Sequence, residues 1–161
     1  MSTIRANAIT GSGGSGGLDI QGTNTNDNAA AGDVGEYVSG SGTIGISTGT
    51  SGQFQNITSI SLTAGDWDIS ALSRVRSATT GVNDFQLAIS INSGNTTTDH
   101  VSSDNVAFQT MAATNVDMAV AVPPYRLSIA STTTVYLKCY FATIDNGTQV
   151  LSSYIKARRV R

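Results

Sequence analysis

The residues of this chain that could do chemistry are few, and their spacing matches no catalytic template. The only histidine, His100, stands in a polar stretch with Asp99 and Asp104, whose carboxylates are ligands of the kind that calcium and magnesium prefer. No spacing in this stretch matches a metal-ligand pattern, so we expect an exposed loop between strands. Asp99 and His100 are then ligand-facing candidates only, and we predict no catalytic residue, no metal site and no cofactor.

Acidic residues and hydroxyl groups are the other candidates for catalysis. Asp66 and Asp68 flank Trp67 and would share one face of a strand, whereas a glycosidase needs two carboxylates on either side of its substrate. A serine or threonine nucleophile needs a base that a third group orients, and no convincing setting for one is present. The sequence therefore predicts a protein that is not an enzyme.

The stretch from Gly11 to Gly16 fits the G-x-G-x-x-G spacing that holds a pyrophosphate at the start of a helix. That motif requires a strand before it and a helix after it, and the sequence predicts neither. We interpret the stretch as a Gly/Ser linker.

Basic residues gather near the C-terminus, as Lys156, Arg158, Arg159 and Arg161. Such a cluster could hold phosphate, but the whole chain has a formal net charge of −2. We therefore expect these side chains to pair with acidic groups of an adjoining subunit or to be solvated, and we predict no binding of nucleic acid.

Composition and length are those of one domain with an arm. The chain has 161 residues, of which only 12% are charged, and serine and threonine are abundant. Its single cysteine, Cys139, allows no internal disulfide and is expected to be a small buried residue. No apolar run is long enough to form a signal peptide or to span a bilayer, so we expect no membrane insertion.

Residues 1–35 are rich in Gly, Ser, Thr, Asn and Ala. Their isolated apolar residues, Ile4, Ile9, Leu18 and Ile20, are too sparse to form a core. We predict that residues 1–35 are an extended anchoring arm that neighbouring subunits hold in place, and that residues 36–161 are a β-sandwich assembly domain.

The rest of the chain shows the period of two that is typical of strands, with no convincing helical period. Expected strands cover residues 34–39, 43–47, 55–62, 66–75, 84–92, 106–111, 116–122, 125–130, 135–143 and 151–160. Turn signals such as the stretch from Asn92 to Asn95 separate them, and Pro123 and Pro124 are expected to end one strand. Many short strands with frequent turns predict an all-β fold, an antiparallel, jelly-roll-like β-sandwich.

Alternation also predicts which side chains would form subunit contacts. Val135, Leu137, Cys139 and Phe141 would face a core, and the tyrosines between them would face outward. The predicted assembly interface consists of Ile4, Ile9, Leu18, Ile20, Tyr136, Tyr140, Tyr154, Arg158, Arg159 and Arg161.

Three parts of the chain resemble small virion structural proteins of tailed bacteriophages, of the tail-fibre or minor structural type. They are residues 26–38, residues 57–70, and residues 132–137 together with the closing 155–161. The resemblance implies a homotrimeric, jelly-roll-like module on the exterior of the virus particle, with other virion proteins of the tail, collar or capsid as partners. It does not distinguish attachment to the tail from attachment to the capsid.

The function expected is therefore that of a virion structural protein, a trimeric tail fibre, spike or knob anchored by its arm, with loop tips such as 96–103 as candidate host-attachment surfaces. One alternative is a capsid decoration protein that stabilises the shell. An alternative of another class is a glycan-binding module, in which Trp67, Tyr125 or Tyr37 would stack on a sugar of the host surface.

Overall fold

The computed structural model describes residues 28–47, 52–77, 82–94, 106–109, 117–144 and 148–161, and this part of the chain consists of strands, turns and short connections without a helix. The strands are β1 (Tyr37–Ser47), β2 (Gln55–Leu62), β3 (Gly65–Ser77), β4 (Val82–Ser90), β5 (Val106–Gln109), β6 (Asp117–Ile129), β7 (Thr133–Ile144) and β8 (Thr148–Arg159). No described segment is a helix long and apolar enough to cross a membrane.

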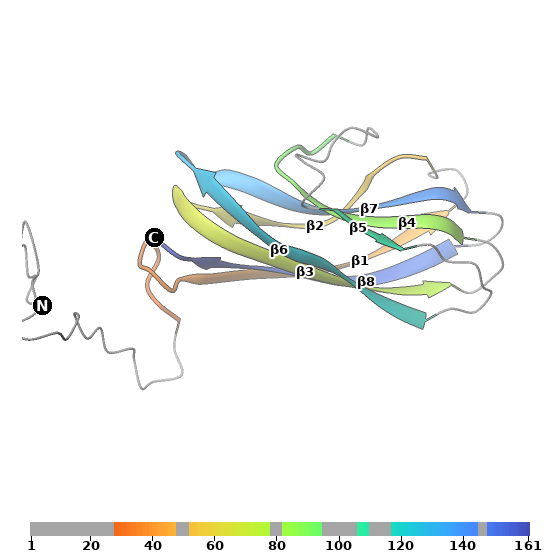
Figure 1. Ribbon diagram of the computed structural model, residues 1–161, viewed down its shortest axis with the longest axis horizontal. Coiled ribbons are helices and arrows are strands. Elements are labelled where there is room, and N and C mark those ends of the chain that lie inside the picture. Colours follow the sequence, from red (N-terminus) through yellow and green to blue (C-terminus); the bar gives the residue numbers. More distant parts are fainter. Residues whose placement is uncertain (1–27, 48–51, 78–81, 95–105, 110–116, 145–147) are drawn as a thin grey trace, which may run out of the picture.

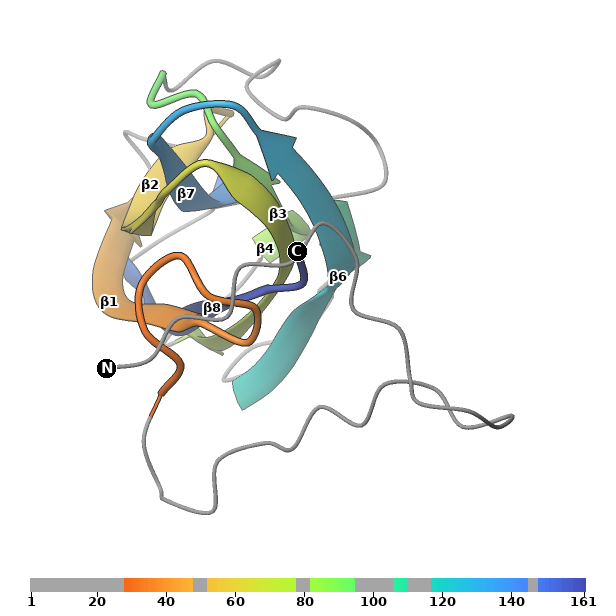
Figure 2. The ribbon, with the colours of Figure 1, turned by 90° about the vertical axis from the view of Figure 1, so that its left-hand side faces the viewer.

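The eight strands form two antiparallel sheets that face each other (Figure 1). One sheet has the order β1-β8-β3-β6 and the other the order β2-β7-β4-β5, so the chain crosses repeatedly between the sheets. Two four-stranded sheets connected in this way form a jelly roll. The view along the strands in Figure 2 shows both sheets curving around a common interior. The predicted all-β, antiparallel sandwich is confirmed.

Alternate side chains of the strands fill the space between the sheets. In β7, Val135, Leu137, Cys139 and Phe141 are at most 1% exposed, as the alternation predicted. Phe141 packs against Phe85 of β4, with ring centroids 5.0 Å apart. Burial of a large apolar side chain such as Leu137 or Phe141 contributes about 1.5–3 kcal/mol to the free energy of folding, because it removes apolar area from water. This burial is the reason that the two sheets pack face to face.

The first strand is longer than predicted. We expected two strands, 34–39 and 43–47, but β1 runs without a break from Tyr37 to Ser47. A Cβ atom at Gly42 would lie 2.5 Å from the carbonyl oxygen of Ile57, and one at Gly40 would lie 3.0 Å from the Ile60 side chain. The glycines are therefore required where β1 of one sheet passes close to β2 of the other.

Pro123 and Pro124 do not end a strand, so that prediction is wrong. Strand β6 continues through both, and its register with β3 shifts between Ile69 and Ala71. Proline lacks the N–H group of a ladder and is tolerated at edges and irregularities, and β6 is the edge strand of its sheet.

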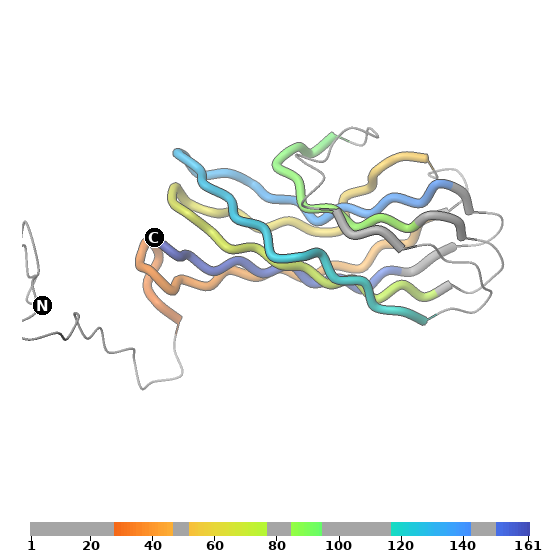
Figure 3. Tube along the Cα trace, in the orientation of Figure 1, coloured from red at the N-terminus to blue at the C-terminus, as the bar shows by residue number. Residues whose placement is uncertain are grey.

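The described chain begins and ends at the same end of the sandwich, which we call the arm end (Figure 3). Here Tyr37, at the start of β1, pairs with Arg158, near the end of β8. The Asn28 side chain accepts a hydrogen bond from the Tyr37 N–H at 2.8 Å and donates one to its carbonyl at 2.7 Å. Residues 28–35, the last part of the predicted arm, are thus attached to the sandwich.

Candidate functional site

The outer face of the β2-β7-β4-β5 sheet is partly covered by its own chain. The Tyr140 ring packs against Phe54, with centroids 5.3 Å apart, and Phe54 is only 1% exposed. Lys138 is fully buried, and its ammonium group donates a hydrogen bond to the carbonyl of Gly94. The Asn56 amide donates another to the carbonyl of Ser93 at 2.9 Å. Short segments before β2 and after β4 therefore cover the middle of this sheet.

This covering changes the expectation for the tyrosines of β7. Tyr140 is half-buried and contacts Phe54, so its ring already has an apolar partner within the chain. Tyr136 is half-buried as well. Neither ring is the freely exposed aromatic that the alternation of the strand predicted.

The outer face of the β1-β8-β3-β6 sheet, in contrast, has no described segment lying over its centre. We call this surface the open face. Its outward residues are Tyr37, Ser39, Ser41, Thr43, Ser152, Tyr154, Lys156, Arg158, Asp68, Ser70, Leu72, Arg74, Arg76, Asp117, Ala119, Ala121, Arg126 and Ser128. Most of them are small or hydroxyl-bearing.

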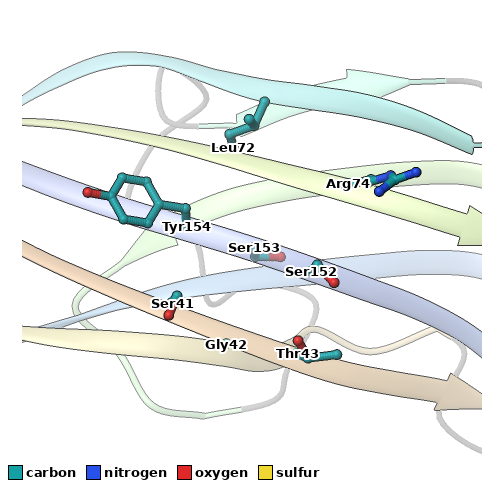
Figure 4. Close-up of a pocket in the computed structure, with 8 residues that line it drawn as sticks. All are labelled: Ser41, Gly42, Thr43, Leu72, Arg74, Ser152, Ser153 and Tyr154. Atoms are coloured by element: carbon teal, nitrogen blue, oxygen red, sulfur yellow. The ribbon is translucent and has the colours of Figure 1, made fainter.

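Two large, partly apolar side chains lie on adjacent strands at the centre of the open face. Leu72 of β3 and Tyr154 of β8 are directly opposite in register, so they project side by side. They remain 46% and 38% exposed, respectively. Ser41 of β1 and Ala121 of β6 continue the same row across the sheet. The row gives the open face an apolar centre with small neighbours, as Figure 4 shows for Ser41, Leu72 and Tyr154.

Shallow depressions lie in sequence along β8. One, of about 340 Å³, is lined by residues of β1, β3 and β8 that include Thr43, Leu72 and Tyr154 (Figure 4). A second lies on the other side of Tyr154 and extends to Lys156. A third, nearer the arm end, lies between Lys156 and Tyr37. The side chains of Tyr154 and Lys156 thus separate recesses that could receive side chains of a partner.

A hydrogen-bonded pair of phenols links β1 to β8 on this face. The hydroxyl groups of Tyr37 and Tyr154 are in direct contact. The hydrogen bonds from Ser39 and Tyr37 lower the pKa of Tyr154, and the nearby Lys156 adds to this effect. The bond to Tyr154 raises the pKa of Tyr37. The pair fixes the orientation of both rings, so they form a pre-arranged part of the surface.

Positive charge surrounds the apolar centre. Five cations project from the open face, namely Arg74, Arg76, Arg126, Lys156 and Arg158, against the two carboxylates Asp68 and Asp117. Arg74 forms a two-bond pair with Asp117, and Arg126 lies 3.4 Å from Asp68. Lys156 and Arg158 form no ion pair with any residue of the described ranges.

Arg159 differs from the other basic residues of β8 because it points into the sandwich. It is 4% exposed and forms an ion pair with Glu36 at 3.0 Å. Its guanidinium also donates to the Ala64 carbonyl at 2.6 Å and to the Thr63 hydroxyl. It lies over the Trp67 ring at 4.4 Å from the centroid. We call these five residues the clasp.

The clasp corrects two sequence predictions. Trp67 is fully buried, and its indole N–H donates to the Thr63 carbonyl at 3.0 Å, so it is a core residue and faces no ligand. Arg159 is buried and paired within its own chain, so it is not part of an exposed assembly surface. The alternation of side chains along β8 could have shown the burial of Arg159, since Arg159 lies on the same side of the strand as the buried Ile155 and Ala157.

The remaining predicted site residues divide into two groups. Tyr154 and Arg158 lie on the open face, and Arg161 lies at the arm end, where its guanidinium pairs with Asp66. Ile4, Ile9, Leu18, Ile20, Asp99 and His100 lie outside the described residues. No group of three or more His, Cys, Asp or Glu that could hold a metal ion occurs within the described ranges.

The comparisons with known proteins gave a distant structural likeness. No protein-family model matches the chain, and a search of curated proteins found no match either. Among solved structures, the chain is similar to the crystal structure of the infectious bursal disease virus VP2 subviral particle, with a TM-score of 0.41 and 9% sequence identity. The alignment covers 89% of this chain and 42% of that chain, so this chain spans less than half of its length. At this TM-score the likeness carries no functional argument.

Proposed function

We propose that this chain is a structural protein of a virus particle, an assembly module on the particle exterior. Its sandwich would pack against neighbouring subunits through the open face, and its N-terminal residues would anchor it to another virion protein. The proposal includes a homotrimer and assigns the chain no catalytic role. Tail fibre, spike or knob is the form we favour, and a capsid decoration protein is the alternative.

The jelly-roll fold is compatible with a virion structural role, but the fold by itself does not distinguish this role from others. Jelly rolls occur in viral capsid proteins, lectins and other binding domains, so the architecture must be combined with its surface. The observation that carries the proposal is the contrast between the two outer faces. Phe54 and Gly94 belong to segments that cover one sheet, whereas the other leaves Leu72 and Tyr154 exposed side by side. A sheet face with an apolar centre and a charged rim is typical of a protein interface.

The arm end supports anchoring as the second part of the proposal. Asn28 is bonded to Tyr37, and the N–H of Gly35 donates to the carbonyl of Arg159 at 2.9 Å. The N–H of Gly32 donates to the Glu36 carboxylate at 2.8 Å. These bonds fix the point from which the N-terminal residues extend. A force on the arm would therefore be transmitted to β1 and β8.

Glycan binding is less well supported. Trp67 is buried under Arg159, and Tyr125 packs against the core, so two of the three aromatic candidates for stacking on a sugar face inward. Only Tyr37 of that set lies on the outer surface, half-buried beside Tyr154. We therefore do not propose a glycan site as the main function.

Quantitative mass spectrometry of purified particles tests the virion role. The chain should be present after purification. A copy number close to that of the major shell protein would identify a decoration protein, and a far lower number would identify a tail component. Absence of the chain from intact particles would contradict the proposal.

A further inference from the structure

We propose that the recess of the open face nearest the arm end binds one unit of an acidic sugar, whose carboxylate or sulfate group is held by Lys156 and Arg158. The site would be a second function beside assembly, and the inference does not depend on the assembly role proposed above. It follows from the charges that line the recess, from the hydrogen-bonding groups between them and from its size.

The recess lies at the rim of the open face, away from its apolar centre. In register, Lys156 pairs with Ser70 of β3, and Arg158 lies between Asp68 of β3 and Tyr37 of β1. Four residues separate Tyr154 from Arg158, which is about 13 Å along the strand. The recess has a volume of about 240 Å³ and is lined by Tyr37, Asp68, Ser70, Lys156, Ala157 and Arg158.

Two cations line the recess from one strand. Lys156 and Arg158 are successive outward residues of β8, with about 7 Å between their Cα atoms, so their long side chains can reach one anionic group together. Neither forms an ion pair with a residue of the described ranges. An arginine can donate two parallel hydrogen bonds to a carboxylate or sulfate, and such bonds between charged groups are about twice as strong as neutral ones.

Asp68 restricts the kind of anion that fits. Its carboxylate lines the same recess and lies 3.4 Å from Arg126 on the neighbouring strand. A simple anion would be attracted by the two cations and repelled by Asp68. A sugar acid also carries hydroxyl groups, which can donate hydrogen bonds to Asp68 and to the Ser70 hydroxyl. The lining therefore matches a ligand that has both an acid group and several hydroxyl groups.

The lining favours a sugar over an acidic peptide. Protein partners gain most of their binding energy from large side chains in well-packed, desolvated pockets, and the aliphatic lining of this recess is limited to Ala157. Pockets for drug-sized ligands have volumes of about 300–1,000 Å³, so this smaller recess suits a single sugar ring. Tyr37 adds a ring that its bond to the Tyr154 hydroxyl holds in place and that can pack against the C–H face of a sugar.

Three small probes test the ligand class in NMR titrations of the full chain. D-glucuronate carries the acid group and the hydroxyl groups, its methyl ester lacks the charge, and cyclohexanecarboxylate keeps the ring and the acid but lacks the hydroxyl groups. Each of the two analogues should bind about tenfold more weakly than D-glucuronate, because each loses one set of hydrogen bonds. Equal affinity of either analogue, or no binding of D-glucuronate and glucose 6-sulfate alike, would overturn the inference.

Two further probes identify the source of the acid group. Glucose 6-sulfate offers a sulfate in place of the carboxylate, and tighter binding of either sugar would support the inference and assign the acid group. Triglutamate offers carboxylates on a peptide and should bind more weakly than the better of the two sugars. Tighter binding of triglutamate would assign the recess to a protein partner and would contradict the inference.

Substitutions locate the site on the open face. Lys156→Gln and Arg158→Gln should each raise the dissociation constant of the better sugar about tenfold. Arg76→Gln is the matched control, because Arg76 is exposed on the same face at the opposite end of β3 and should change the dissociation constant less than about twofold. Similar losses in all three variants would indicate a diffuse effect of charge and would overturn the site. Thermal unfolding checks that each variant is folded, and the oligomeric mass tests the assembly role separately.

Discussion

At the scale of single residues, the clasp shows how one buried charge joins distant parts of the chain. Arg159 of β8 contacts Glu36 before β1, Thr63 and Ala64 between β2 and β3, and Trp67 of β3. The guanidinium is held by hydrogen bonds and a counter-ion, which is the condition under which a charge can be buried. The clasp closes the arm end of the sandwich and ties the residues that follow Asn28 to it.

Arg159→Gln should destabilise the fold by about 3 kcal/mol or more, because it leaves the Glu36 carboxylate buried without its partner. Arg158→Gln changes the adjacent residue, which is exposed on the open face, and should cost less than about 0.5 kcal/mol. Urea unfolding followed by Trp67 fluorescence measures both. Similar losses for the two variants would show that the clasp does not stabilise the arm end.

Asp66 should make stability fall at low pH. A hydrogen bond from Ser128, together with Arg161 and Arg126, lowers the pKa of Asp66 from 3.8 to about 2. Because the folded state binds this proton less readily than the unfolded state, the contribution is present above pH 3.8 and is lost as the pH falls toward 2. Asp66→Asn should therefore show a shallower loss of stability over this range in thermal unfolding. An unchanged slope would contradict this assignment.

At the scale of elements, β1 and β2 show which parts of the fold the sequence can predict. Strand β2 has the predicted bounds, since Ile60 and Leu62 alternate with Ser59 and Ser61 and the run is rich in β-branched residues. The prediction failed for β1 because Gly40 and Gly42 weaken the apparent strand pattern. The two glycines leave room for Ile57 and Ile60 of the other sheet. A local sequence pattern does not show such contacts between different strands.

Gly42→Ala should destabilise the protein by about 1–3 kcal/mol, since the new methyl group would overlap the backbone carbonyl of Ile57 and the two strands would have to separate. Ser41→Ala is the matched control, because Ser41 is exposed on the open face one residue earlier. Chemical denaturation of both variants checks this. A loss that is equal at the two positions would contradict the close approach of β1 to β2.

At the scale of the whole molecule, the two sheets differ in what covers them, and only part of this difference could be predicted. Alternation places Tyr154 and Arg158 together on an outward face, so the sequence was sufficient for them. The covering of Tyr140 by Phe54 depends on how a connecting segment folds back over a sheet, and it was missed. The burial of Arg159 was also missed, although the alternation of side chains along β8 indicated that Arg159 faces the core.

Two different surfaces of the sandwich take part in the proposed assembly. If the open face is an assembly surface, the arm end and the face provide two separate attachments, one to a virion scaffold and one to a neighbouring copy. The clasp would keep the two in a fixed relation, because Arg159 and Arg158 are adjacent in β8 but point to opposite sides.

The mass of the full chain in solution tests the central claim most directly. Sedimentation equilibrium over a range of concentrations should give a species of three chains, each of 16.6 kDa, that dissociates on dilution. A mass of one chain at every concentration, up to the solubility limit, would contradict the account.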